Sequence, residues 1–265
     1  MQERYRRDRL QTFGLLFALA FVIHVAYTFY VRPRAEGWQA AEKAHQAANP
    51  DYKPQRSIWV VIKDPEQESA IILGLWGLGM SVFKVIAIRR QRLQLDRGVL
   101  RVAPGFRILP TDVREYARKL EELPASERDL IPARTMRRAL KRFGETSDVQ
   151  DAATAVHDYC ESEAARLDSE LALIRFCVWA IPAIGFVGTV RGIGNALAGA
   201  QLALRGDTSA VTSGLGVSFN STFVALILSI VIMYVIHELQ LRQERLVLDT
   251  EQHVDDAVVS NLQSR

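Results

Sequence analysis

The chain has 265 residues, of which 49% are hydrophobic and 24% are charged, and its formal net charge is +3. Neither this charge nor the pI of about 8.9 calls for a nucleic-acid partner, because the arginines cluster at the ends of apolar runs, as membrane topology requires. The mean hydropathy of +0.02 hides a separation into lipid-like blocks and highly charged blocks, which points to a membrane protein.

Four apolar blocks reach the roughly 20 residues that a helix needs to cross a bilayer. We expect these transmembrane helices at 10–31, 70–88, 180–204 and 211–236. Several arginines precede the first block, as in a signal peptide. Its apolar core is too long for a typical signal, and the following VRPRAEGW lacks a small-x-small cleavage site. A retained helix with a cytoplasmic amino terminus is therefore the favoured interpretation.

The distribution of arginines orients the chain and divides it. Five arginines follow the second block, so the positive-inside rule places that side in the cytoplasm. The expected fold is all-α and polytopic, with four transmembrane helices, two of them extended into a cytoplasmic helical bundle. Its parts are an N-terminal transmembrane hairpin with an outer loop, a cytoplasmic helical region, a channel-forming transmembrane pair and a cytoplasmic C-terminal helix, at 1–88, 89–170, 171–236 and 237–265.

An amphipathic pattern begins at Asp148 and continues to the third membrane block. Its apolar residues recur at helical spacing, and no proline or glycine interrupts the pattern before Pro182. The sequence therefore predicts one helix without a break from the cytoplasmic region into the membrane.

Small residues mark the third and fourth blocks. Gly188 and Gly192 form a GxxxG pattern, with Gly185 one turn earlier and Gly214 at the start of the fourth block. Small residues let helix backbones approach closely in lipid, so helix packing is the favoured role of these glycines.

Hydroxyl groups follow the same helices. Ser218 and Thr222 continue the stripe of Gly214 at spacings of four, and Thr189 and Asn195 lie on the neighbouring block. A single hydroxyl in a membrane helix often bonds only to its own preceding carbonyl. A whole stripe also fits a polar path, so helix packing and ion passage both stay open at this point.

Arg191 is the most costly residue in the membrane blocks. It either pairs with an acid of a partner chain or extends its head group to the surface along its aliphatic stem. The blocks contain no Asp or Glu, and His24 has no visible partner. If the chain helps to move protons, we expect a second protein to supply the carboxylate.

The remaining chemistry-bearing patterns are few. Cys160 and Cys177 are isolated, which argues against a metal site and a disulfide. The sequence contains no phosphate-binding loop, no GxSxG elbow and no HExxH pair, so we expect neither an enzyme nor a cofactor.

Two segments, AIPAIGFVGTVRGIGNAL and GLGVSFNSTFVALILSI, together resemble the MotA/TolQ/ExbB proton channel family. The likeness covers roughly 180–230 and is greatest to the TolQ and ExbB branch. The first motif is matched by Pro182, Gly185, Gly188, Thr189, Val190, Gly192 and Ile193, and the second by Gly214 and Thr222.

The resemblance implies a multi-pass subunit of the bacterial inner membrane that forms a homo-oligomer, a pentamer in the family. This ring would surround a single-span partner like MotB, TolR or ExbD, which carries a membrane aspartate. Ion flow would drive rotation or force. Thr189 and Thr222 occupy the positions of the two family threonines that line the ion path.

This chain departs from the family pattern at several points. Val217 stands where relatives often carry a glutamate, Arg191 is unusual in the motif, and four spans resemble the MotA topology rather than the three of TolQ and ExbB. A stator of the Zorya defence type is a further alternative, but the short cytoplasmic tail expected here argues against its long-tailed form. Two alternatives to a proton-driven stator remain, a sodium-driven stator and a non-conducting membrane scaffold that organises cytoplasmic partners.

Overall fold

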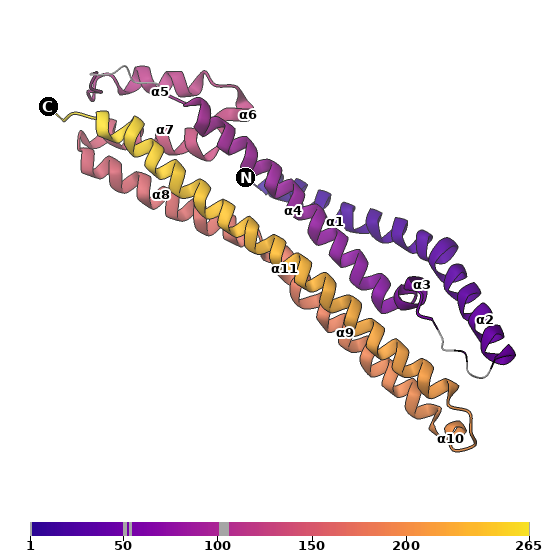
Figure 1. Cartoon of the computed structure of the whole chain (residues 1–265). Coiled ribbons are helices and arrows are strands. Elements are labelled where there is room, and N and C mark those ends of the chain that lie inside the picture. Colours follow the sequence, from indigo (N-terminus) through magenta and orange to yellow (C-terminus); the bar gives the residue numbers. More distant parts are fainter. Residues whose placement is uncertain (1, 50–51, 53–54, 101–105, 265) are drawn as a thin grey trace. The chain divides into compact units, whose positions relative to one another are not determined.

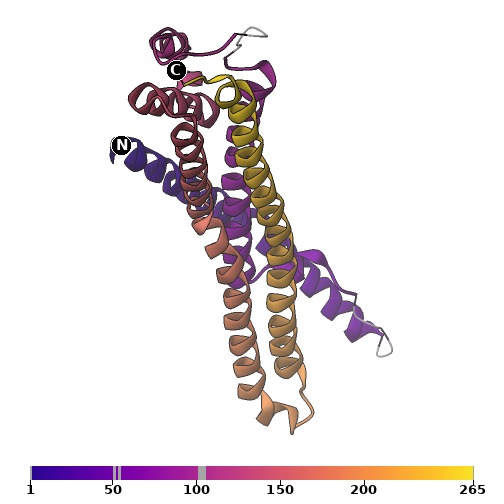
Figure 2. The same cartoon turned by 90° about the vertical axis from the view of Figure 1, so that its left-hand side faces the viewer.

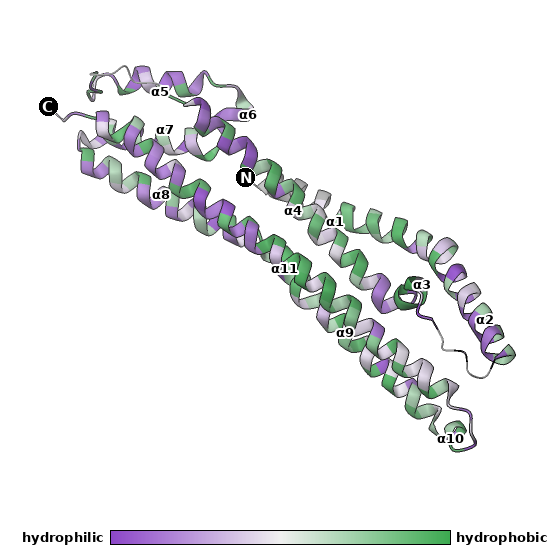
Figure 3. Ribbon diagram, in the orientation of Figure 1, coloured by the Kyte–Doolittle hydropathy of each residue, from purple (hydrophilic) through white to green (hydrophobic). Residues whose placement is uncertain are grey.

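The computed structural model describes residues 2–49, 52, 55–100 and 106–264. This part of the chain is helical, and its one isolated β-bridge joins Ile108 and Leu262. Four of its helical stretches are long and apolar enough to cross a membrane: Thr12–Ala48, Pro65–Arg97, Val149–Ala198 and Ser209–Asn261. Hydrophobic residues concentrate on α1, α4, α9 and part of α11 (Figure 3). The expected all-α class with four apolar spans is confirmed.

The chain divides into two compact units. Unit 1 comprises Met1–Ser81 and Leu173–Ile236, and unit 2 comprises Val82–Ala172 and His237–Arg265. Two helices, α4 (Pro65–Arg97) and α11 (Ser209–Ala257), contribute to both units. Unit 1 also contains α1 (Gln2–Ala26), the π-helical segment η1 (Tyr27–Val31), α2 (Arg32–Ala48), α3 (Ile58–Ile62), α9 (Ala172–Ala198) and α10 (Ala200–Ala203). Unit 2 contains α5 (Val113–Glu121), α6 (Ala125–Arg128), α7 (Ile131–Thr146), α8 (Val149–Ser169) and the 3-10 turn η2 (Val259–Asn261).

The N-terminal helix is longer than the sequence predicts. We expected it to end at residue 31 before an outer loop, but helical structure continues to Ala48. The wider turns of η1 connect α1 to α2, and these two helices meet at an angle (Figure 1). A π-helical turn is a common cause of such a bend. Tyr27 and Val31, at the two ends of η1, are both buried.

The packed pair α9 and α11 forms one side of unit 1, and both views show these helices side by side (Figures 1 and 2). Pro182 lies inside α9 and has no N–H to donate to the carbonyl of Val178. The hydroxyl of Ser229 on α11 donates to that carbonyl at 3.2 Å. The neighbouring helix therefore satisfies the polar group that the proline leaves unpaired, as membrane helices require.

The predicted unbroken helix is interrupted between unit 2 and unit 1. Helix α8 ends at Ser169 and α9 begins at Ala172, with a turn at Glu170 and Leu171. The expectation of an uninterrupted helix was therefore wrong at this point. No proline or glycine marks the turn, and this is why composition did not reveal it.

The core of unit 2 lies between α5, α7, α8 and the end of α11. Helix α7 contributes Met136, Ala139, Leu140 and Phe143, all of which are fully buried. Asp148 begins α8, and its carboxylate accepts a hydrogen bond from the N–H of Gln150 at 2.7 Å. This N-cap satisfies an otherwise free donor, so the sequence defines where α8 starts.

Unit 1 keeps a large apolar surface uncovered. Phe29 is 78% exposed, Trp179 is 80% exposed and Val190 is 72% exposed. Single exposed hydrophobic residues are ordinary, but this many large apolar side chains exposed on one unit need lipid or another subunit to cover them. The surface of unit 1 therefore agrees with membrane-spanning helices.

The close packing of α9 on α11 predicts a sharp difference between two glycines of α9. A Cβ at Gly192 would lie 2.5 Å from the backbone nitrogen of Ser218 and 2.6 Å from the carbonyl oxygen of Gly214. Backbone atoms cannot rotate away, so Gly192→Ala should destabilise the pair by about 1–3 kcal/mol through overpacking. Thermal unfolding of the full chain in detergent, followed by circular dichroism, measures this loss.

Gly194 is the matched control, because a Cβ there meets nothing within 4 Å. Gly194→Ala should leave the melting temperature unchanged or raise it, since alanine is the better helix former. Equal melting temperatures for the two variants would show that α9 and α11 do not pack as closely as described.

Candidate functional site

The candidate ion path centres on two hydroxyl groups that face each other across α9 and α11. Thr189 and Thr222 are hydrogen-bonded through their Oγ1 atoms, and both side chains are half-buried. Thr189 also donates to the carbonyl oxygen of Gly185 at 3.1 Å and lies 3.4 Å from that of Ser218. We call Thr189 and Thr222 the hydroxyl pair. It forms a polar spot between two apolar helices.

The other two residues expected on the path lie differently. The side chain of Ser218 is buried, and this residue contributes its carbonyl oxygen to the hydroxyl pair. Asn195 is exposed on α9, and among the described residues its side chain has no hydrogen bond to the pair. The structure thus brings Ser218, but not Asn195, to the two threonines.

The expected packing glycines lie along the contact between α9 and α11. A Cβ at Gly185 would meet the Cβ of Ala225 at 2.6 Å, and one at Gly188 would collide with Ser221. Gly192 and Gly214 oppose each other backbone to backbone. We call Gly185, Gly188, Gly192 and Gly214 the glycine seam. Because the seam holds the two backbones in contact, the short threonine side chains can reach each other.

Arg191 meets acids of its own chain. Its guanidinium makes two contacts of 2.7 Å with the carboxylate of Glu66 and lies 3.7 Å from Asp64. The Glu66 side chain is 10% exposed and the Arg191 side chain is 39% exposed. A bidentate pair of this kind is among the strong charge-assisted contacts. The sequence analysis considered a partner's acid or the membrane surface for Arg191, and the structure shows an internal partner.

Glu66 belongs to the first turn of α4, and three consecutive residues of this turn contact four other helices, α1, α2, α9 and α11. We call Glu66, Gln67 and Glu68 the acidic turn. Gln67 donates to the hydroxyl of Ser221 on α11 at 3.3 Å. Acidic side chains are favoured in the first turn because the helix dipole is positive there. The acidic turn therefore stabilises its own helix while it connects α4 to α9 and α11.

Glu68 holds the bend of the N-terminal helix. One oxygen lies 2.7 Å from Nδ1 of His24, and the other accepts from Arg32 at 2.7 Å. His24 lies in the last turn of α1 and Arg32 is the first residue of α2, so the two residues flank the π-helical segment η1. The Glu68 side chain is 8% exposed, so both of its oxygens have partners where an unpaired charge would be costly.

Asp64 precedes the acidic turn and is less well compensated. Its Oδ2 atom is buried without a hydrogen-bond partner. Burial raises the pKa of this carboxyl above its ordinary value, and the nearby charges of Lys63 and Arg191 offset this only in part. Asp64 therefore carries an electrostatic cost at neutral pH.

Sequence reasoning missed the acidic turn because the hydropathy block starts at residue 70, one helical turn after Pro65. The sequence nevertheless carries a pattern typical of a helix start at Pro65. Proline is favoured at the first position of a helix, and Glu66 and Glu68 suit its first turn. The partners of these acids lie far away in the sequence, and no periodicity identifies them.

The bidentate pair predicts strong coupling between Arg191 and Glu66. In a double-mutant cycle, Arg191→Gln and Glu66→Gln should each destabilise the full chain, and together they should cost less than their sum by about 1–3 kcal/mol. Thermal or denaturant unfolding in detergent measures these values. The exposed pair Arg92–Asp249 provides the control and should couple by less than about 1 kcal/mol. Additive effects at Arg191 and Glu66 would contradict the assigned contact.

The raised pKa of Asp64 predicts a stability effect with a defined sign. The folded chain binds this proton more tightly than the unfolded chain does, so stability falls as pH rises from the ordinary carboxyl range through the raised pKa. Asp64→Asn should therefore raise the melting temperature at pH 7, and its advantage should vanish as the pH is lowered toward about 4.

Asp207 serves as the control, because its pKa is shifted in the opposite direction to that of Asp64. Hydrogen bonds from Ser209, including one from its backbone N–H at 3.0 Å, lower the pKa of Asp207. Asp207→Asn should lower the melting temperature at pH 7, with the difference fading in acid. A lower melting temperature for Asp64→Asn at pH 7 would contradict the stated cost of Asp64.

The site offers hydrogen-bonding groups and ion pairs rather than metal ligands. Within the described ranges, no three His, Cys, Asp or Glu side chains come together as a metal site would require. Both cysteines are buried and free.

Comparison with known proteins agrees with this arrangement. Residues 127–252 match the MotA/TolQ/ExbB proton channel family, and this segment contains the glycine seam, the hydroxyl pair and Arg191. Neither the curated proteins nor the solved structures gave a match to the chain. The resemblance seen in the two motifs is thereby confirmed, and four apolar helices together with this family indicate a multi-pass membrane protein. Over residues 127–252 the chain is thus similar to the MotA/TolQ/ExbB proton channel family.

Proposed function

We propose that the chain is the channel-forming subunit of a proton-driven stator in the bacterial inner membrane. Ion flow past the hydroxyl pair would be converted into mechanical work by the assembled complex. The observation that carries this proposal is the hydrogen-bonded pair Thr189 and Thr222, held between two apolar helices within the segment that matches a proton channel family. Hydroxyls both donate and accept hydrogen bonds, so they suit a proton path.

A second protein would supply the titratable acid. The two acids of the acidic turn are engaged within the chain, since Glu66 contacts Arg191 and Glu68 contacts His24 and Arg32. A proton carrier must be able to gain and lose its proton, and an ion pair opposes this. We therefore propose a single-span partner like MotB, TolR or ExbD, whose membrane aspartate would come close to Thr189 and Thr222.

The uncovered apolar surface of unit 1 supports assembly in the bilayer. Helices α9 and α11 expose Phe186, Phe219 and Phe223 by at least 60% each. We propose that copies of this chain form a closed ring, a pentamer as in the family, with lipid around it. The arginines after residue 88 favour a cytoplasmic location for unit 2 and for both termini.

The hydroxyl pair gives the direct test of conduction. Thr189→Val and Thr222→Val keep the side-chain shape but remove one hydroxyl each. The loss of roughly 1 kcal/mol of hydrogen bonding corresponds to about fivefold slower proton flux. Proton uptake should be measured in cells that co-express this chain with the proposed single-span partner. Serine at either position keeps the hydroxyl and should preserve most of the flux.

Thr212→Val is the matched control, because Thr212 is exposed in the first turn of α11 and its hydroxyl donates to the carbonyl oxygen of Thr208 at 3.0 Å. Its flux should equal that of the unmodified chain. Full flux in both Thr189→Val and Thr222→Val would refute the proposed path. If the function of the complex survives collapse of the proton gradient, the scaffold alternative is indicated. If the function is lost only when the sodium gradient is removed, a sodium-driven stator is indicated.

A further inference from the structure

A strongly basic groove lies in unit 2, outside the proposed ion path. Helix α7 presents five cations at helical spacing, while its opposite face is buried in the core. Because the core fixes the backbone of α7, the cations project from a rigid support. These cations are Arg134, Arg137, Arg138, Lys141 and Arg142.

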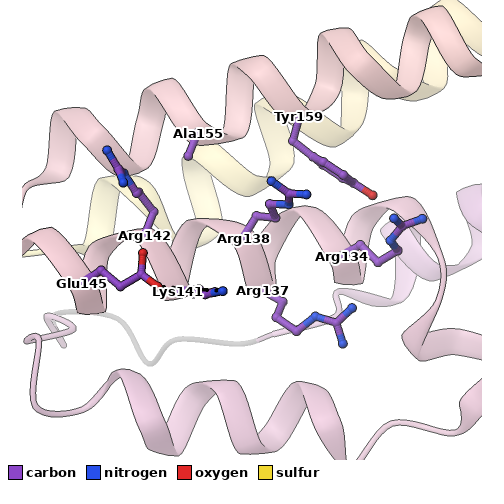
Figure 4. A pocket seen from close by; sticks show the side chains of 8 residues that line it. All are labelled: Arg134, Arg137, Arg138, Lys141, Arg142, Glu145, Ala155 and Tyr159. Atoms are coloured by element: carbon purple, nitrogen blue, oxygen red, sulfur yellow. Dashed lines mark ion pairs between the residues drawn. The ribbon is translucent and has the colours of Figure 1, made fainter.

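The groove is concave and has a definite size. Ala155 and Tyr159 of α8 form its second wall, and Glu145 is the acid that lines it (Figure 4). Its cavity volume of about 480 Å³ lies within the range of roughly 300–1,000 Å³ that is usual for small-molecule sites. The small side chain of Ala155 leaves space between the two helices. We call this space the basic groove.

Tyr159 orders two of the arginines. Its hydroxyl donates to the buried carboxylate of Glu163 at 2.7 Å, which fixes the ring. The guanidinium carbons of Arg138 and Arg134 lie 5.0 Å and 5.5 Å from the ring centroid, within the range of cation–π contacts. The ring holds these cations without neutralising them.

Internal acids compensate the cations only in part. Glu163 lies 3.5 Å from Arg134 but also makes two contacts with Arg166, so its charge is shared. Arg142 lies 3.4 Å from Asp151, and Lys141 lies 3.9 Å from Glu145. Arg137 and Arg138 make no ion pair with any described residue. The basic groove therefore retains an excess of positive charge and free guanidinium donors.

The composition of the groove favours phosphate. Four of its five cations are arginines, whose planar fork binds phosphate oxygens in pairs. A phosphate group carries close to two charges and three acceptor oxygens, so one group can serve two arginines. Within α7 and α8 no large hydrophobic side chain is exposed, whereas binding to a membrane surface needs apolar contacts as well.

We propose that the basic groove between α7 and α8 binds a small soluble anion that carries at least two phosphate groups. Inorganic tripolyphosphate is the probe. The full chain, reconstituted in nanodiscs of zwitterionic lipid, should bind it in isothermal titration calorimetry, with an affinity that falls as salt rises. Monophosphate should bind more weakly, because it reaches fewer of the cations.

Arg138→Gln should weaken tripolyphosphate binding by at least about tenfold, since it removes charge-assisted hydrogen bonds at the centre of the groove. Arg138→Lys keeps the positive charge but loses the planar guanidinium, so its affinity for tripolyphosphate should lie between those of the unmodified chain and of Arg138→Gln. Arg114→Gln changes an exposed arginine of α5 outside the groove and should bind as the unmodified chain does. Unchanged melting temperatures show that the variants fold.

Four results would overturn the proposal. The first two are no binding at millimolar tripolyphosphate, and an Arg114→Gln variant that loses as much affinity for tripolyphosphate as Arg138→Gln does. The other two are tighter binding of a poly-glutamate peptide than of tripolyphosphate, and binding of the chain only to nanodiscs that contain anionic lipid. The last two would assign the groove to an acidic protein or to a membrane surface. Proton flux does not enter these measurements, so they succeed or fail independently of the proposed ion path.

Discussion

The contact between α9 and α11 is the constraint on which the rest of the candidate site depends. In lipid, apolar side chains gain little from association, so helices pair through close packing and polar contacts. The glycine seam allows backbone contact at Gly192 and Gly214. This closeness lets Thr189 reach Thr222 and lets Ser229 bond to the carbonyl that Pro182 leaves free. The proline of the motif therefore depends on the small residues, because the close packing that they allow brings Ser229 to the carbonyl that Pro182 leaves free.

The acidic turn provides the ion pairs that keep charged side chains inside the apolar unit 1. Arg191 lies two residues after Thr189 on α9, and an unpaired guanidinium there would be costly. Glu66 compensates it from α4, and Glu68 does the same for Arg32 at the bend of the N-terminal helix, where it also contacts His24. The electrostatic cost of burying a charge is not fully compensated at Asp64, where one buried carboxylate oxygen has no hydrogen-bond partner. Charges that are compensated inside the chain leave the mobile proton to a carboxylate from elsewhere in the proposed complex.

The sequence predicted those features that depend on local pattern and composition. Four apolar blocks gave the all-α membrane fold, and two motifs around Gly188 and Thr222 gave the family. Pairings between distant segments could not be predicted, because periodicity assigns a residue to a helix face but does not identify the facing helix. Arg191 and Glu66 are 125 positions apart. The turn before α9 was missed because it contains ordinary helix formers. The direct continuation of the helix past residue 31 was missed because the polar residues that follow resembled a loop.

A structure of this chain assembled with its single-span partner would test the central claim most directly, that the glycine seam presents a hydroxyl pair to an ion path. The account predicts that Thr189 and Thr222 face a central space and that a carboxylate of the partner lies within hydrogen-bonding reach of one of them. Side chains of both threonines directed toward lipid, with the partner's acid in contact with other residues, would contradict it.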